Sequence, residues 1–331
     1  MEKRQAATMK DVAQLAGVGV GTVSRVVNGM KVKASTLEKV TTAIQQLGYQ
    51  PDEYARGLKT KKSNTIALIV PTIWHPFFSE FAYYVEKALN RQNYKLFICN
   101  ADGDVSAELE YLEMLKSNKV DGLIAITYSD IDKYVSSNLP FVSVDRHFSE
   151  KIPYVTSANY EGGNLAAKEL LRRGASHLAY IGGRNIFANE TSYRKDGFLA
   201  QCQLATDKKV SVLEMPEPIE DFEGQLRTFI QKYPDIDGIF AINDFMGLSI
   251  IHELEKIGKQ TPRDYQIIGF DGLRASQSQD FYLSTIAQSL PEMAEAAVSL
   301  LFDVMSGAAE EERVLVPVRF VEGGSTRLLE E

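Results

Sequence analysis

The stretch from Thr8 to Gly29 reads TMKDVAQLAGVGVGTVSRVVNG and decides how the N-terminal part of the chain folds. Apolar residues recur in it at helical spacing, first up to Gly17 and then up to the pair Asn28-Gly29. Each set predicts a short amphipathic helix. The two sets are Met9, Val12, Ala13 and Ala16, and then Val23, Val26 and Val27. Two helices joined by a short turn that contains glycine predict a helix-turn-helix.

A third helix is predicted directly afterwards. Ser35 and Glu38 have the spacing of a capping box, and Gly48 ends the helix. Its apolar face is expected to contain Leu37, Val40, Ile44 and Leu47. Three short helices around a small core, with positive charge outside, are typical of a DNA-reading domain.

The distribution of charge agrees with this reading. Residues 1–62 carry eleven Lys or Arg against five Asp or Glu, although the whole chain of 331 residues has a net charge of −8. The remaining residues therefore have a balance of −14. A small basic head on a large acidic body indicates a polyanion-binding module joined to a part with another task.

These segments resemble the N-terminal signature of the lactose/galactose repressor family of bacterial transcription regulators. The matching motifs are Asp11-Val12-Ala13, Ala16-Gly17-Val18, the run from Thr22 to Asn28, and Leu47-Gly48-Tyr49-Gln50-Pro51. The resemblance implies that the second helix enters the major groove of a palindromic operator. It places Thr8, Val20, Gly21, Thr22, Ser24, Arg25, Asn28 and Tyr49 among the DNA-contacting residues, with Val20 and Gly21 discriminating between operators.

The segment 51–63 is predicted to be a hinge. It is too short for a stable isolated helix, so we expect it to be ordered only when paired with a second copy on DNA. By the resemblance, Leu58 wedges open a minor-groove base step, and Arg56 and Lys59 contact phosphates. A plain flexible linker is the alternative, and Gly57 favours it slightly.

From Thr65 onward, short apolar runs alternate with helical stretches, which predicts parallel sheets covered by helices on both faces. Strands are expected at 66–70, 96–99, 123–126, 141–144, 178–181, 210–213, 239–242, 267–270 and 314–321, and helices near 77–92, 105–118, 160–173, 192–203, 221–232, 244–257 and 291–305. The resulting fold class is an all-α helix-turn-helix domain followed by an α/β core of two lobes. By the resemblance, this core is periplasmic-binding-protein-like.

The predicted domains follow from this pattern. Residues 1–50 form the DNA-binding domain, 51–63 the hinge, and 64–331 the effector-binding and dimerisation core. Within the core, the first lobe is expected to comprise about 64–158 and 289–318. The second lobe then comprises about 159–288 and 319–331. A chain that crosses between lobes several times predicts a hinged clamp with its ligand between them.

Ligands of open α/β sheets contact the loops at the carboxyl ends of strands. Polar residues stand at several of these ends, and the resemblance implies that Asp145, Arg194, Asn243 and Asp271 contact the effector. Carboxylates, an amide and a fork-shaped guanidinium suit sugar hydroxyls. Alternatively, Asp271 and Asp244, the residue after Asn243, cap the helices that follow, and Arg194 makes a surface or interlobe salt bridge.

Three further effector residues are expected after the first core strand. Trp74 and His75 stand where a platform for a sugar ring would be useful, and Phe78 follows them. Core or dimer packing is the alternative for Phe78 and its neighbour Phe77.

No catalytic, metal or cofactor site is predicted. The chain lacks the serine-nucleophile, zinc and phosphate-loop motifs, and its four histidines are widely separated. Its two cysteines cannot form a disulfide framework or a zinc site by themselves. The N-terminus lacks a signal-peptide pattern and no apolar run is long enough to span a bilayer, so a cytoplasmic protein with no membrane contact is expected.

The sequence therefore predicts a homodimeric repressor of carbohydrate genes, controlled by a sugar or sugar phosphate. Two alternatives remain: a regulator on the same scaffold that senses a nucleobase or nucleoside, and a global regulator activated by a phosphorylated carrier protein. An enzyme such as a glycosidase would leave the DNA-binding head unexplained. Because the C-terminal residues show no leucine heptads, a coiled-coil tetramer is not expected.

Overall fold

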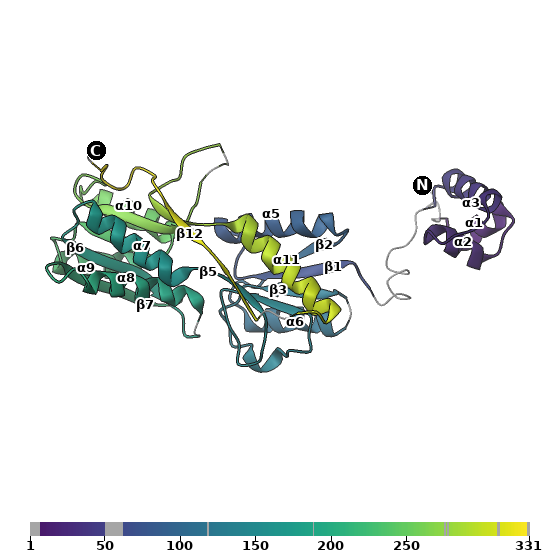
Figure 1. The fold of residues 1–331 in the computed structure, drawn as a ribbon, viewed down its shortest axis with the longest axis horizontal. Helices are drawn as coiled ribbons and strands as arrows, with labels where there is room; N and C mark the ends of the chain where they lie inside the picture. The colour runs from purple at the N-terminus through teal and green to yellow at the C-terminus, as the bar shows by residue number, and fades with distance from the viewer. Residues whose placement is uncertain are drawn as a thin grey trace. The chain divides into compact units, whose positions relative to one another are not determined.

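The computed structural model describes residues 7–49, 62–117, 119–187, 189–274, 276, 278–309 and 312–329. By its internal contacts the chain divides into two compact units, Met1–Ser63 and Asn64–Glu331 (Figure 1). The predicted hinge residues Arg56, Leu58 and Lys59 lie outside the described residues.

The first unit contains the predicted helix-turn-helix and the third helix. Its described helices are α1 (Met9–Ala16), α2 (Val20–Val27) and α3 (Ala34–Leu47). A capping box starts α1, because the Thr8 hydroxyl accepts from the Asp11 N–H and the Asp11 carboxylate accepts from the Thr8 N–H. The helix ends at Gly17, whose φ of 64° is the left-handed conformation that glycine adopts most easily.

The core of this unit is small and apolar, and it consists of Val12, Ala13, Ala16, Val23, Val40, Ala43 and Tyr49. Two details of the predicted third helix are wrong. Its cap position is Lys33, so Ser35 lies inside the helix and cannot cap it. Leu37 and Leu47, expected on the buried face, are 47% and 37% exposed. The helix buries a narrower stripe, because only two short helices cover it.

The second unit contains two six-stranded sheets, in the orders β11-β5-β4-β3-β1-β2 and β12-β10-β9-β8-β6-β7. The first consists of β1 (Thr65–Val70), β2 (Lys95–Asn100), β3 (Gly122–Ala125), β4 (Phe141–Val144), β5 (Tyr154–Ser157) and β11 (Arg313–Val316). The second consists of β6 (His177–Arg184), β7 (Lys209–Pro216), β8 (Gly238–Ala241), β9 (Gln266–Asp271), β10 (Thr285–Gln288) and β12 (Val318–Val321). All pairings are parallel except that of β12 with β10.

Helices cover both faces of each sheet, as the continuous apolar strands predict. They are α5 (Pro76–Arg91), α6 (Val105–Lys116), α7 (Asn159–Arg172), α8 (Tyr193–Gln203), α9 (Phe222–Lys232), α10 (Asp244–Lys256) and α11 (Leu290–Ser306), with short 3₁₀ turns at Asp132–Tyr134 and Glu190–Ser192. Ile66 and Leu68 of β1 pack in the core beneath α5 and α11, whereas Ala67 and Ile69 face α6. The alternation follows from the two-residue period of a strand. In the second sheet, α7 and α8 cover one face and α9 and α10 the other.

The chain passes from one sheet to the other after β5, after β10 and after β11 (Figure 1). We call the first sheet with α5, α6 and α11 the first lobe, and the second sheet with α7 to α10 the second lobe. The single strand predicted at 314–321 is wrong. Pro317 has no N–H to donate, so the run is divided into β11 and β12, which belong to different sheets.

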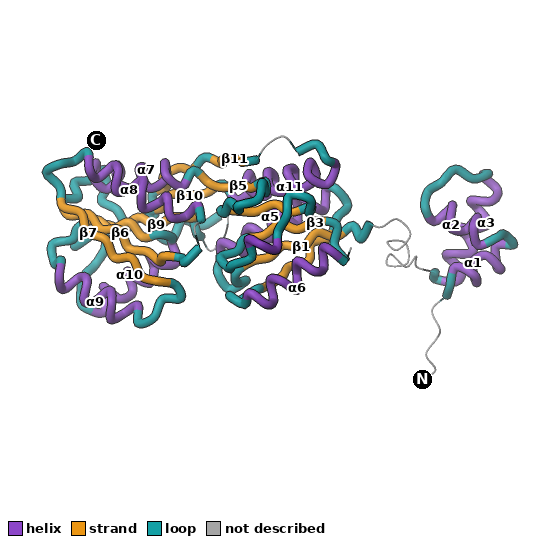
Figure 2. The backbone as a smooth tube through the Cα atoms, turned by 90° about the horizontal axis from the view of Figure 1, so that it is seen from below, coloured by secondary structure: helices purple, strands orange, loops and turns teal. Residues whose placement is uncertain are grey.

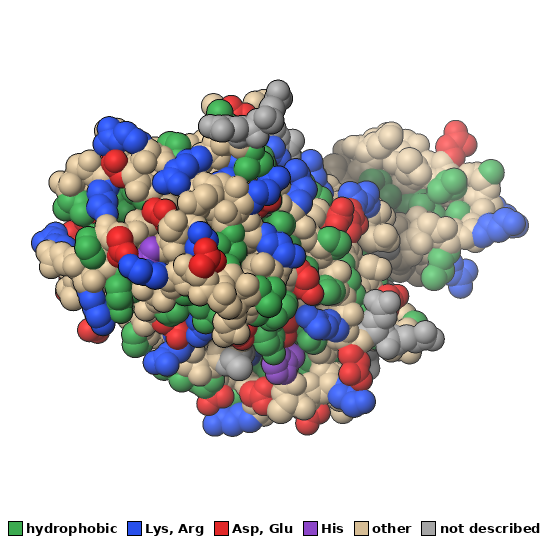
Figure 3. Space-filling model, turned by 60° about the vertical axis from the view of Figure 1, so that its left-hand side comes forward, with side chains coloured by type: hydrophobic (Ala, Val, Ile, Leu, Met, Phe, Trp, Pro, Cys, Tyr) green, Lys and Arg blue, Asp and Glu red, His purple; other side chains and the backbone are tan. Residues whose placement is uncertain are grey.

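On the face drawn in Figure 3, acidic and basic side chains are interspersed among apolar ones. None of the described helices is long and apolar enough to cross a bilayer. The two cysteines, Cys99 and Cys202, are buried and unpaired, and burial raises the pKa of each thiol to about 12.

Candidate functional site

The first candidate surface is the outer side of α2. Val23 points into the core, whereas Val20, Gly21, Arg25 and Asn28 are exposed. The partly exposed Thr22 and Ser24 complete the predicted set on this helix. The Asn28 amide donates to the Ser24 carbonyl at 2.7 Å and to its hydroxyl at 3.3 Å, which ties the end of the helix to its middle.

The other two predicted DNA contacts of this unit have structural roles. Thr8 caps α1, and Tyr49 is only 9% exposed in the core. Their DNA contacts stay predictions, as do those of Arg56, Leu58 and Lys59 beyond the described residues.

The second candidate site is a group of polar side chains at the carboxyl ends of the strands. We call Asp145, Asn159, Arg194, Asp271 and Gln288 the polar cluster. Asp145 follows β4 in the first lobe, and Asp271 and Gln288 end β9 and β10 in the second. All five are at most 9% exposed. The structure therefore brings three of the predicted effector residues together with two that the sequence analysis missed.

Arg194 lies at the centre of this cluster. Its Nε donates to Asn159 Oδ1 at 2.8 Å, and its Nη1 donates to the Ile242 carbonyl at 2.8 Å and lies 3.6 Å from Asp271 Oδ1. The guanidinium also stacks 3.7 Å from the centre of the Phe270 ring. These contacts fix the orientation of the guanidinium. Arg194 and its partners all belong to the second lobe, so the salt bridge between Arg194 and Asp271 does not join the two lobes.

Close packing of two helices brings Arg194 to this position. A Cβ on Gly163 of α7 would meet the Arg194 carbonyl oxygen at 1.8 Å, and one on Gly197 of α8 would meet the Tyr160 carbonyl oxygen at 1.9 Å. The helices can approach this closely only because both residues lack a side chain. The start of α8 is thereby held against α7.

Asp271 is the most strongly perturbed acid of the cluster. Burial raises the pKa of its carboxyl to about 7, and Asp145 adds to the rise, while Arg194 and the hydrogen bond from Gln288 oppose it. Gln288 Nε2 donates to Asp271 Oδ1 at 2.8 Å. The backbone of Asp271 has a φ of 116°, an unfavourable region for a residue with a side chain. Strain of this kind is characteristic of functional sites.

Asp145 connects the cluster to the first lobe. Its Oδ1 accepts from Thr156 at 2.7 Å and from Asn159 Nδ2 at 3.4 Å, and its carbonyl accepts from the Glu190 N–H at 2.8 Å. A second link is the hydrogen bond from the Ser157 hydroxyl of β5 to Gln288. Movement of one lobe against the other therefore changes the surroundings of the cluster.

Asn243 lies beside the cluster and caps α10, because its Oδ1 accepts from the Met246 N–H at 2.8 Å. The alternative that Asp244 is the cap is wrong, since Asp244 lies one residue inside the helix. Its buried carboxylate instead accepts from the N–H groups of Gly272 and Leu273. Burial and the nearby Asp271 raise the pKa of Asp244 well above its usual range. Asp244 thus fixes the loop that follows Asp271.

His75 joins the site from the first lobe. Its Nδ1 accepts from the Phe77 N–H and starts α5, and its ring lies 5.3 Å from that of Phe78 and 5.1 Å from that of Phe245 in the second lobe. Burial, and next the positive charge of Arg194, lower its pKa to about 4. Its buried Nε2 has no hydrogen-bond partner among the described residues. Phe78 is buried in the core of the first lobe, and Trp74 is 84% exposed.

Sequence reasoning missed Tyr128, Asn159, Gln288 and Phe245. Tyr128 follows β3, and its pKa is raised by burial and next by Asp145, which places it at the cluster. The strand-end rule that selected Asp145 could have found it. Asn159 follows β5 and Gln288 ends β10, two strands of four residues that the sequence analysis did not identify. Their buried polar residues, such as Thr156 and Thr285, conceal the apolar pattern of a strand.

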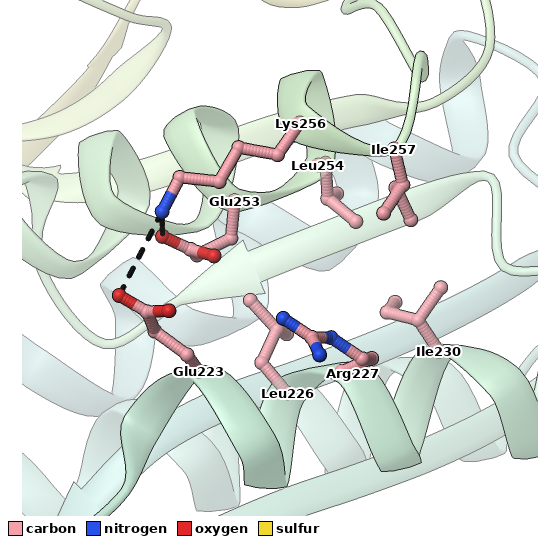
Figure 4. A pocket seen from close by; sticks show the side chains of 8 residues that line it. All are labelled: Glu223, Leu226, Arg227, Ile230, Glu253, Leu254, Lys256 and Ile257. Carbon is pink, nitrogen blue, oxygen red and sulfur yellow. Dashed lines mark hydrogen bonds and ion pairs between the residues drawn. The ribbon is translucent and has the colours of Figure 1, made fainter.

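A small cavity elsewhere is too small for a metabolite. It lies between α9 and α10 and has a volume of about 30 Å³, and Lys256, one of its lining residues, pairs with Glu223 and Glu253 (Figure 4). That volume is close to the space of one water molecule. Among the described residues, no group of three or more His, Cys, Asp or Glu could hold a metal ion.

Two family models match the chain. Residues 8–52 match that of bacterial regulatory proteins of the lacI family, and residues 63–323 match periplasmic binding proteins and the sugar-binding domain of the LacI family.

Several curated repressors and solved repressor structures are also similar to this chain. The sucrose operon repressor of Pediococcus pentosaceus is 34% identical over 95% of this chain and 98% of its own. The ribose operon repressor of Bacillus subtilis (strain 168) is 35% identical over 97% of this chain and 99% of its own. The lac repressor dimer bound to operator and the anti-inducer ONPF is 21% identical, with a TM-score of 0.82 over 97% of this chain and 99% of that one, and has the same fold.

Proposed function

This chain belongs to the LacI family of bacterial regulatory proteins, and we propose that it represses genes of carbohydrate uptake or breakdown under the control of a sugar bound at the polar cluster. It is a DNA-binding repressor with an effector-binding core. The observation that carries the proposal is the buried arrangement of Arg194, Asp271 and Asp145 where the two lobes meet. A ligand there contacts both lobes and therefore changes the equilibrium between their arrangements.

The chemistry of the cluster favours a neutral polyhydroxy ligand. Asp145 and Asp271 provide carboxylate oxygens, and Arg194 provides N–H donors. Because His75 Nδ1 accepts from the Phe77 N–H, the unpartnered Nε2 of the neutral ring carries the proton and can donate a hydrogen bond. A sugar hydroxyl both donates and accepts, so it suits this mixture. Sucrose and ribose appear in the names of the two relatives above, which supports a sugar as the effector class.

For the DNA contacts, the exposed side of α2 has the required character. Val20 can touch a thymine methyl group, and Arg25 can reach a phosphate or a guanine. Gly21 offers no side chain, so base readout depends mainly on Arg25 and Ser24. The expected minor-groove wedge at Leu58 complements this contact and belongs to the proposal.

A homodimer is supported by the edge of the first sheet. β2 is an edge strand, and its Phe97 and Ile98 are each 47% exposed. An uncovered apolar edge strand is a pairing surface. A second copy placed there would give the twofold symmetry that a palindromic operator requires. Because the protein acts on chromosomal DNA, we place it in the cytoplasm.

A ligand screen of the full-length protein tests the effector class. D-ribose, sucrose, D-glucose and D-fructose are compared with adenine, hypoxanthine and uracil by thermal shift, because a ligand stabilises the folded state that binds it. We expect at least one sugar to raise the melting temperature, and Arg194→Lys to abolish that rise because lysine lacks the fork of donors. Arg263→Lys, whose side chain is 65% exposed, is the matched control.

The outcomes separate the proposal from its alternatives. A shift with a nucleobase and with none of the sugars would contradict the sugar class. If none of the small molecules raises the melting temperature and the protein instead forms a stable complex with a phosphorylated carrier protein, the protein-activated regulator would be favoured. Consumption of a sugar during the incubation would show an enzyme.

A further inference from the structure

A hollow lined by residues of both lobes lies beside the polar cluster, with which it shares Asn159. Its volume is about 450 Å³, within the range of small-molecule sites. The first lobe contributes His147, Tyr154, Arg313 and Leu315, and the second contributes Asn159, Tyr160, Glu161, Glu190 and Tyr193. β5 and β11, which carry Tyr154, Arg313 and Leu315, lie side by side at the edge of the first sheet (Figure 2).

The buried carboxylate of Glu190 is the central polar group of this hollow. Its side chain is only 4% exposed, yet Oε2 lies 3.3 Å from Arg313 Nη2 and Oε1 lies 3.4 Å from His147 Nδ1. Arg313 and His147 belong to the first lobe, whereas Glu190 belongs to the second. The two exposed partners, 48% and 54% exposed, leave their remaining donors open to a ligand.

The hollow and the polar cluster share one residue. Asn159 lines the hollow, and its amide donates to Asp145, Thr156 and Ser157 through Nδ2 and accepts from Arg194 through Oδ1. The Glu190 N–H of the hollow also donates to the Asp145 carbonyl. The other four residues of the cluster, Asp145, Arg194, Asp271 and Gln288, are not among those that line the hollow, so the two linings are largely separate.

The lining of the hollow fits a neutral sugar or polyol. Tyr160 and Tyr193, 44% and 42% exposed, offer aromatic faces for the C–H groups of a sugar ring, and Glu161 and Glu190 offer acceptors for hydroxyl groups. Arg313 offers a planar set of donors. Two carboxylates beside one arginine and a histidine disfavour an anionic ligand such as a phosphate.

We propose that this hollow is a second carbohydrate-binding site, distinct from the polar cluster, where a neutral sugar or polyol bridges the two lobes. A ligand bound there contacts Arg313 of the first lobe and Tyr160 and Tyr193 of the second. It therefore favours the arrangement in which Glu190 is held by the first lobe, and it is thermodynamically coupled to a ligand at the cluster.

Titration calorimetry of the full-length protein with D-ribose and with sucrose tests the proposal. We expect two binding events per chain for the sugar that occupies both sites. Tyr160→Ala should weaken one event at least tenfold, because it removes an aromatic face, and should leave the other within about threefold. Tyr193→Ala is the second variant of the hollow, and Tyr134→Ala, a tyrosine 40% exposed elsewhere in the first lobe, is the control.

The Arg194→Lys variant separates the two sites. The event that Tyr160→Ala weakens should persist in Arg194→Lys, whereas the other should be lost. If only the event at the hollow is present, the second site stands and the effector role of the polar cluster fails. A single event that Arg194→Lys abolishes, or events that neither tyrosine variant weakens, would overturn the second site.

Discussion

Nη1 of Arg194 lies 3.6 Å from Oδ1 of Asp271, and each of the two side chains is only 5% exposed. The pair is therefore an ion pair in a region of low polarity, where removing one partner leaves a buried charge. Burial nevertheless keeps the pKa of Asp271 near 7, so the carboxyl changes its charge in the neutral range. A ligand that donates to Asp271 would favour the charged form.

The raised pKa of Asp271 predicts how stability changes with pH. Because the folded-state pKa of about 7 lies above the ordinary value of 3.8, the native state binds more protons between these values, and this group makes the free energy of unfolding fall as pH rises through that window. The slope is at most about 1.4 kcal/mol per pH unit. Urea unfolding at pH 5, 6, 7 and 8 should show Asp271→Asn gaining stability relative to the wild type up to about pH 7. The exposed Asp207→Asn is the control, and a pH-independent difference for Asp271→Asn would contradict the prediction.

His75 predicts the opposite dependence on the acid side. Its folded-state pKa of about 4 lies below the ordinary 6.5, so the unfolded state binds more protons and stability is lost as pH falls from about 6.5 to 4. His75→Asn should reduce this loss, because asparagine keeps a cap for α5 and does not titrate. Unfolding of both proteins is compared at pH 4.5, 5.5 and 7. Parallel curves for the two proteins would show that His75 is not buried as described.

The contact between α7 and α8 predicts a large effect of a single methyl group. Gly197→Ala should lower the free energy of unfolding by about 2 kcal/mol or more, because its Cβ would meet a backbone oxygen that cannot move alone. It should also weaken the sugar response, since α8 carries Arg194. Both variants are compared with the wild type by thermal unfolding. Gly21→Ala, whose Cβ would meet nothing within 4 Å, is the control and should be as stable as the wild type or slightly more stable. Equal stability of Gly197→Ala and the wild type would contradict the close packing.

In the first unit, the exposed position of Arg25 predicts that its removal weakens DNA binding in a salt-dependent way. Arg25→Ala should weaken binding to duplexes selected from a random pool and reduce the slope of log K against log salt by about one if the contact is to a phosphate. Binding is measured by fluorescence anisotropy at several salt concentrations. Arg172→Ala, a surface residue of α7 with a side chain 56% exposed, is the control and should bind as the wild type does. Unchanged affinity for Arg25→Ala would remove it from the interface.

The sequence predicted the parts of this fold that follow from apolar periodicity. The helices around Val12 and Val23 and the buried strand around Leu68 have clear patterns, and the structure contains them. The short strands β5 and β10 could not be found because buried hydrogen bonds, not apolar side chains, satisfy Ser157 and Gln288. That information exists only once distant segments meet.

The candidate site was predicted only in part, because some of its residues are defined by contacts between distant segments. Asp145 and Asp271 stand at strand ends that the sequence indicates, whereas Asn159 is identified only by the residues that surround it. The capping role of Asn243 and the inner position of Asp244 depend on whether α10 starts at residue 244 or one residue later. Sequence spacing does not resolve such a shift.

The central claim, that the polar cluster and the DNA-reading surface exchange free energy, is tested by operator affinity with and without the sugar that stabilises the full-length protein. The dissociation constant for a selected palindromic duplex is measured for the wild type and for Arg194→Lys at saturating sugar. We predict a change of roughly 5- to 150-fold in the wild type, the range of a coupling of about 1–3 kcal/mol, and less than about twofold in the variant. An equal dissociation constant for the wild type with and without the sugar would contradict the account.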